Sequence, residues 1–105
     1  MNIPVFRLLA ALGMAAILPT IASPAFAYTG QNLAPGAKIG IDQARGIALK
    51  AHPGKITDEE LERETGGSGL RYSFDIRSGK VTHEVGVDAA TGRVLENKTE
   101  GANPD

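Results

Sequence analysis

The sequence predicts an α+β fold, with one N-terminal helix packed on a small antiparallel β-sheet of three to four strands. Three observations predict it. Apolar residues recur at helical spacing between Ile41 and Ala51. Two segments that alternate between apolar and polar residues flank a turn at Ser78 and Gly79. A second glycine-containing turn, at residues 88–92, precedes a further short apolar segment.

The composition excludes several classes of function. The chain has 105 residues, which is enough for one small domain. It contains no cysteine, so disulfide bonds, thiolate catalysis and cysteine-ligated metals are excluded. The formal net charge of −1 provides no electrostatic attraction to nucleic acid, and we predict no nucleic-acid partner.

Residues 1–27 are typical of a secretory signal peptide. Arg7 precedes the uncharged run from Leu8 to Leu18, and small residues at Ala25 and Ala27 suit a cleavage site. As a helix this run is about 16 Å long, too short for a hydrocarbon core of roughly 30 Å. We therefore predict cleavage after Ala27, a periplasmic or secreted protein, and no membrane span once the signal is removed.

The mature chain is predicted to begin with a flexible lead-in, residues 28–38, because glycine, proline and small polar residues dominate it. The helix follows and ends before Pro53 and Gly54. Gly46 lies inside this helix, where glycine lowers stability. We expect Gly46 to let the helix approach the sheet closely.

The segment from Leu70 to Asp88 predicts a β-hairpin. A two-residue loop at Ser78 and Gly79 would pair Ile76 with Val81 and place every apolar side chain on one face. The opposite face is polar and forms a candidate partner-binding surface. Its residues are Arg71, Ser73, Asp75, Thr82 and Glu84.

The segment from Ile56 to Glu64 is compatible with either a helix or a strand. Thr57 and Glu60 have the spacing of a helix capping box. As a strand the segment needs a bulge or a bend, because Ile56 and Leu61 would otherwise lie on opposite faces. Its carboxylates form either a solvated acidic face or a patch that attracts a basic partner or divalent cations. This acidic patch consists of Asp58, Glu59, Glu60, Glu62 and Glu64.

The C-terminal part is predicted to contain one short strand over residues 93–98, with Val94 and Leu95 as its apolar residues. Residues 97–105 are almost entirely polar and predict a solvated tail. We therefore place the folded domain at residues 39–99 and a disordered tail at residues 100–105.

In this order the segments "IDQARGIALKAHPGKI", "ELERE", "LRYSFDI" and "HEVGVDAATGRVLE" resemble the PepSY domain family. The resemblance covers residues 38–97 and implies a helix packed on an antiparallel sheet, which favours a strand for the segment from Ile56 to Glu64. Members of that family occur in propeptides of thermolysin-like metallopeptidases, in membrane proteins and as small exported proteins. The activity proposed for the family is the restraint of peptidases. The resemblance supplies no catalytic or ligand motif.

Neither histidine has the spacing of a metal site, and the serines lack a neighbouring base. We expect His83 to be a partly buried structural residue opposite Phe74, and His52 to interact with the end of the helix. We predict no enzyme activity, cofactor or metal.

The sequence therefore favours an exported module that binds another extracytoplasmic protein, either a peptidase or a membrane protein, and restrains a peptidase in trans. The alternative is a periplasmic sensor or a divalent-metal or ligand-binding accessory module that uses the acidic segment and His83.

Overall fold

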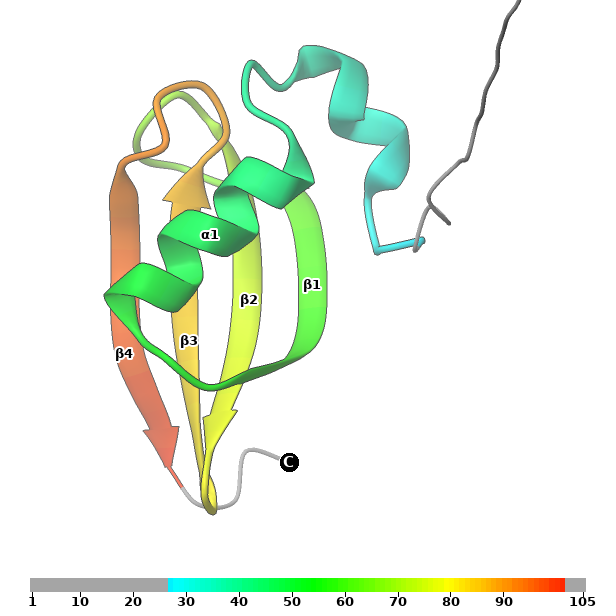
Figure 1. Cartoon of the computed structure of the whole chain (residues 1–105). Helices are drawn as coiled ribbons and strands as arrows, with labels where there is room; N and C mark the ends of the chain where they lie inside the picture. The colour runs from blue at the N-terminus through cyan, green and yellow to red at the C-terminus, as the bar shows by residue number, and fades with distance from the viewer. Residues whose placement is uncertain (1–26, 102–105) are drawn as a thin grey trace, which may run out of the picture.

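The structure, a computed structural model that describes residues 27–101, has one α-helix lying across one face of a four-stranded antiparallel sheet (Figure 1). This confirms the predicted fold class. The predicted signal peptide up to residue 26 lies outside the described residues. Among the residues described, no helix has the length and apolar character needed to cross a membrane.

The elements follow one another in a simple order, and sequential strands are neighbours in the sheet. A 3₁₀ helix, η2 (Gln31–Gly36), precedes the α-helix α1 (Ile41–Ala51). The strands are β1 (Lys55–Arg63), β2 (Leu70–Ser78), β3 (Val81–Asp88) and β4 (Val94–Gly101). The sheet order β1-β2-β3-β4 leaves β1 and β4 at its two edges.

The segment predicted as a flexible lead-in is fastened to the sheet at two points, so this prediction was incomplete. Thr29 forms an isolated parallel bridge with Glu60, and its carbonyl accepts a 2.8 Å hydrogen bond from the Leu61 amide. At the other end of the segment, the Lys38 and Ile39 amides donate to the Ala89 carbonyl at 2.9 and 3.0 Å. These partners are distant in the sequence, so local composition did not reveal them.

The segment from Ile56 to Glu64, whose sequence is compatible with either a helix or a strand, forms most of strand β1. Its pairing with β2 shifts register between Ile56 and Asp58, which is the bulge that a strand here requires. Ile56 therefore pairs with Ile76, Leu61 pairs with Tyr72, and both β1 residues face α1.

The hairpin between β2 and β3 forms, but its loop is Gly79 and Lys80 rather than Ser78 and Gly79. Ile76 consequently pairs with His83 instead of Val81. Gly79 has φ 64°, which suits the first central position of the turns that close tight hairpins. The predicted loop would have required that conformation of Ser78. Because the register differs by two residues, every side chain keeps its predicted face.

Strand β4 extends to Gly101, so the prediction of a tail was wrong for residues 97–101. The rest of the predicted tail, residues 102–105, lies outside the described residues. Thr82 pairs with Gly101, and His83 pairs with Thr99. Backbone hydrogen bonds to β3 hold this segment although it has almost no apolar side chains. A polar sequence is also usual for a strand at the edge of a sheet.

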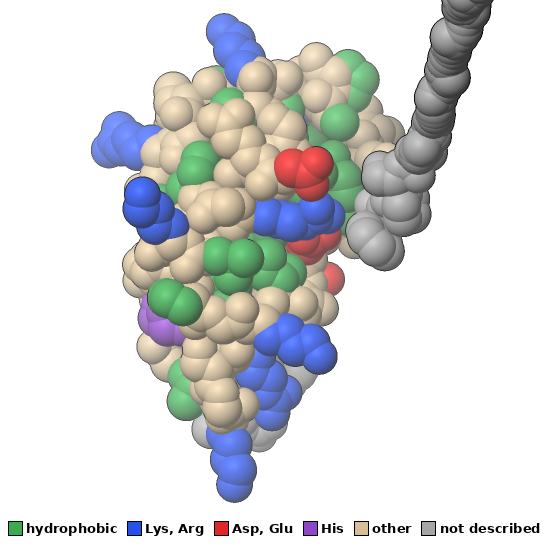
Figure 2. Space-filling model, in the orientation of Figure 1, with side chains coloured by type: hydrophobic (Ala, Val, Ile, Leu, Met, Phe, Trp, Pro, Cys, Tyr) green, Lys and Arg blue, Asp and Glu red, His purple; other side chains and the backbone are tan. Residues whose placement is uncertain are grey.

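The core lies between α1 and the sheet. Ala44 and Ala48 of α1 are fully buried, and their small side chains let the helix approach the strands. Gly46 points to the other side of the helix, where an added Cβ would meet no atom within 4 Å. The predicted role of Gly46 in close packing was therefore wrong. Lys and Arg side chains are prominent on the surface around α1 (Figure 2). The other buried hydrophobic residues are Leu61, Tyr72, Phe74, Ile76, Val85 and Val87 of the strands, and Ala89 in the turn after β3.

A buried carboxylate joins the two loops at one end of the sheet. Asp88 is 1% exposed and accepts hydrogen bonds from the amides of Ser68, Ala90 and Thr91 at 2.7, 3.1 and 2.9 Å. The Thr91 hydroxyl adds a fourth at 3.0 Å. Burial opposes ionisation of Asp88, but the hydrogen bonds from Ser68 and Thr91 outweigh it and hold the pKa of this carboxyl well below its usual range.

Replacing Asp88 is expected to destabilise the domain strongly. Asp88→Asn keeps the shape but removes the charge and presents an amide group to backbone donors. We expect the free energy of unfolding in urea to fall by about 2–3 kcal/mol. Asp42→Asn, at a side chain that is 92% exposed, serves as the control and should change stability by less than about 0.5 kcal/mol. Equal stability of the two variants would contradict the structural role of Asp88.

Two glycine substitutions should change stability in opposite directions. Gly46→Ala should raise the free energy of unfolding by about 0.5–1 kcal/mol, because alanine favours the helix and the site is open. Gly67→Ala should lower it, because Gly67 has φ 57° and its Cβ would lie 2.5 Å from the Asp88 carboxylate. Thermal unfolding of both variants checks these signs; a loss of stability in Gly46→Ala would refute the open environment.

Candidate protein-binding surface

The face of the sheet opposite α1, called here the outer face, is the candidate site. Within residues 27–101 the helix α1 packs against β2, β3 and β4, whereas η2 contacts β1, and neither covers the outer face (Figure 1). The pleat of the strands places five predicted partner-binding residues together on this face. They are Arg71, Ser73, Asp75, Thr82 and Glu84. Ser73 and Thr82 are buried there, at 8% and 6% exposed, so the prediction that they contact a partner was wrong.

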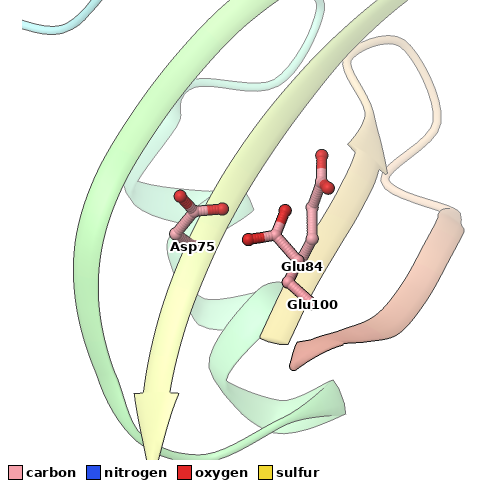
Figure 3. A group of neighbouring side chains, drawn as sticks. All are labelled: Asp75, Glu84 and Glu100. Atoms are coloured by element: carbon pink, nitrogen blue, oxygen red, sulfur yellow. The ribbon is translucent and has the colours of Figure 1, made fainter. Parts of the chain in front are cut away.

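A row of acidic residues crosses the outer face. Asp58 pairs directly with Asp75, and Asp75 pairs directly with Glu84. Glu100, from the irregular end of β4, brings a fourth carboxylate to the same place. Oxygen atoms of Asp75, Glu84 and Glu100 lie within 4.8 Å of one another (Figure 3). We call Asp58, Asp75, Glu84 and Glu100 the carboxylate row. Like charges directly opposite one another destabilise a sheet.

The cations on this face compensate only one carboxylate. Arg71 and Lys98 both pair with Glu96, with N–O distances of 3.4 and 3.0 Å. Ser73 donates a 2.7 Å hydrogen bond to Glu62. Within the described part of the chain, the carboxylate row, Glu60 and Glu62 form no ion pair, so the outer face carries a concentrated negative charge.

This crowding changes the protonation of the outer face. Burial raises the pKa of Glu84 to about 7, together with a hydrogen bond to Glu100 and the charges of Glu96, Glu100 and Asp75. Burial and the charges of Glu100 and Asp58 raise the pKa of Asp75 as well. Glu84 therefore holds a proton in a pH range where exposed carboxylates are fully ionised.

The predicted acidic patch is divided between two faces. Asp58, Glu60 and Glu62 lie on the outer face, while Glu59 points toward α1 and pairs with the Arg45 guanidinium. Glu64 follows the end of β1 and is exposed. The five residues therefore do not act as one patch.

Sequence reasoning missed two acidic residues of the outer face, Glu96 and Glu100. Both lie in or beside the segment that we predicted to be a tail. The signal that could have revealed them is the alternation of Glu96, Lys98 and Glu100 at a period of two, which places charged side chains on one face of a strand.

The two histidines meet on the helix side of the sheet. The ring of His52, at the end of α1, stacks on the ring of His83 with a centroid distance of 3.8 Å and an angle of 10°. His83 also contacts the Asn97 side-chain oxygen at 2.5 Å and the Thr99 hydroxyl at 3.0 Å. His83 lies opposite Ile76 rather than Phe74. It cannot join the carboxylate row, because the sheet separates them; a metal site that combines His83 with the acidic segment is therefore wrong.

The edge of β1 is a second available surface. A shallow depression of about 810 Å³ lies beside it and is lined by Tyr28, Arg45, Ile56 and Glu59, among others. Thr29 already pairs with this edge, which shows that the backbone of β1 can accept an added strand.

Comparison with known proteins identifies one related family. Residues 38–98 match the family model described as "Peptidase propeptide and YPEB domain". This range agrees with the resemblance found in the sequence and spans the helix and nearly all of the sheet. No curated protein and no solved structure matches the chain significantly.

The carboxylate row predicts that stability depends on pH. Glu84 has a folded pKa of about 7, above its reference value of 4.5. Its stabilising contribution to the free energy of unfolding is therefore fully present below pH 4.5 and is lost as the pH rises through 7. Glu84→Gln should remove this loss and be about 1 kcal/mol more stable than the wild type at pH 8, a value reduced for solvent screening. Urea unfolding between pH 5 and 8 measures this effect.

The control is Glu64→Gln, which removes an exposed carboxylate beyond the end of β1. It should keep the wild-type dependence on pH. The assignment to Glu84 fails if the two variants lose stability equally between pH 5 and 8.

Proposed function

Since the chain belongs to the PepSY family, the peptidase propeptide and YPEB domain, we propose that it is an exported, non-catalytic module that binds a peptidase and restrains it in trans. PepSY domains are in general propeptide or inhibitor modules rather than catalysts. Export rests on the signal-like residues 1–27.

The observation that carries this proposal is the open outer face. A single helix covers one side of the sheet, whereas charged and polar side chains of all four strands are available on the other. A surface of this kind suits recognition of another protein, because complementary charge steers the encounter and fixes the orientation of the complex.

Restraint of a peptidase requires no reacting group from this chain. A module that docks beside the catalytic cleft excludes substrate by occupying the surface that the substrate needs. The free part of the β1 edge, next to Arg45 and Ile56, could add backbone hydrogen bonds to such a complex through strand addition.

The proposal is tested by peptidase inhibition. The chain without residues 1–27, added to exported peptidases of the same cell, should slow peptide hydrolysis in a saturable manner. Reversing two charges of the outer face, with Asp75→Lys and Glu84→Lys, should weaken inhibition at least tenfold, about 1.4 kcal/mol or more.

Lys50→Glu reverses a single charge on the exposed side of α1, away from the outer face, and serves as the control; it should change inhibition less than about twofold. No inhibition by a saturating excess of the wild-type chain, against any exported peptidase, would reject the proposed function.

The alternative function, a divalent-cation-binding accessory module, now depends only on Asp75, Glu84 and Glu100, since His83 lies on the other face. Calorimetric titration with Ca²⁺ separates the two functions. Binding heat that persists in about 0.15 M salt and disappears in Glu84→Gln would favour the alternative, whereas absence of heat would remove it.

A further inference from the structure

The outer face departs from the rules that stabilise an antiparallel sheet. Asp58, Asp75 and Glu84 are successive direct partners across three strands, where opposite charges or uncharged pairs would be more stable. Lys98 lies opposite Glu84 on β4, but its ammonium group pairs with Glu96. Such departures from local stability are expected where a surface serves a function.

The charges of the molecule are also unevenly distributed. Lys and Arg side chains are prominent on the helix side (Figure 2). The outer face gathers carboxylates from every strand, and they outnumber the Lys and Arg residues that share it, which are Lys55, Arg71, Arg77 and Lys98. The formal net charge of the whole chain is only −1, so the negative outer face reflects the arrangement of charge rather than an acidic composition. An arrangement of this kind orients the molecule toward a partner of opposite charge.

We propose that the outer face docks a basic polypeptide segment, whose Lys or Arg side chains lie over the carboxylate row. This inference rests on the proposed function and deepens it, because it names the chemistry of the surface that the partner presents.

The spacing of the acidic residues fits an extended segment. Asp58, Glu60 and Glu62 follow one another at a period of two along β1, which places their side chains about 6.6–6.8 Å apart on one face. An extended partner segment that runs along β1 repeats its own side chains at the same period. Lysine or arginine at every second position would therefore meet Asp58, Glu60 and Glu62 in turn. At its Asp58 end the segment reaches the carboxylate row, which crosses the strands at a spacing of about 4.8 Å.

The extent of the charge favours a polypeptide over a single ion. The carboxylate row crosses four strands, a span of about 14 Å at the usual strand spacing. A calcium ion binds its ligands within about 2.6 Å and would leave Asp58, Glu60 and Glu62 uncompensated. Several cationic side chains on one backbone can compensate the whole face.

The test uses the chain without residues 1–27 and a labelled ten-residue peptide in which Lys alternates with Ser. Fluorescence anisotropy at low and at about 0.15 M salt measures binding. The wild-type chain should bind this peptide, with affinity falling as salt rises, and should not bind the matched peptide in which Glu alternates with Ser. Absence of binding at low salt, or equal binding of both peptides, would overturn the inference.

Matched variants locate the binding surface. The double variant Asp75→Asn with Glu84→Gln should bind the Lys peptide at least tenfold more weakly. The control, Asp42→Lys on α1, changes the net charge by the same two units away from the outer face and should bind within twofold of the wild type. An equal loss in the double variant and in Asp42→Lys would indicate attraction to net charge and overturn the inference. Unfolding does not confuse the result, because neutralising the carboxylate row is expected to stabilise the chain.

A second copy of the chain is the competing occupant, since its helix side carries basic side chains. Sedimentation equilibrium decides this: self-association that is lost in Asp75→Asn with Glu84→Gln would assign the outer face to a second copy and overturn the inference. If the same double variant inhibits a peptidase as strongly as the wild-type chain does, this surface is rejected but the proposed function is not. Peptide binding without inhibition would reject only the proposed function.

Discussion

The buried carboxylate of Asp88 is the interaction on which the arrangement of helix and sheet depends. It accepts hydrogen bonds from the loop before β2 and from the turn before β4, and so fixes both connections at one end of the sheet. The neighbouring Ala89 donates to Leu70 and accepts the amides of Lys38 and Ile39, which lead into α1. One ionised group, fully satisfied by donors, thereby sets where the helix begins over the sheet.

The position of α1 determines how the two faces of the sheet differ. Ala44 and Ala48 bring the helix close to the apolar face, which Tyr72 reinforces by donating a 2.8 Å hydrogen bond to the Ile39 carbonyl. The outer face receives no comparable cover from the residues described. Its side chains therefore meet no second layer of structure among these residues, and their charges are not balanced by one.

The sequence was informative where the pattern is local and less so where the partner is distant. Alternation between Leu70 and Asp88 predicted which side chains share a face, because the period of a strand is independent of its register. The register itself depends on the φ angle of Gly79, which composition did not specify. The strand character of β1 needed the family resemblance. The stacking of His52 on His83 arises from a tertiary contact, which no local pattern encodes. The pairing of residues 97–101 was signalled only by the alternation of Glu96, Lys98 and Glu100.

Asp88 and the carboxylate row show how the same chemical group can serve opposite purposes in one small fold. Asp88 is surrounded by donors, so burial is compensated and ionisation is favoured. Glu84 and Asp75 are partly buried beside other carboxylates, so ionisation is disfavoured and the pKa of each rises. The second arrangement weakens the domain, and donors or cations supplied by a partner would relieve it. A partner that supplies them binds more tightly because it removes repulsion already present in the free protein.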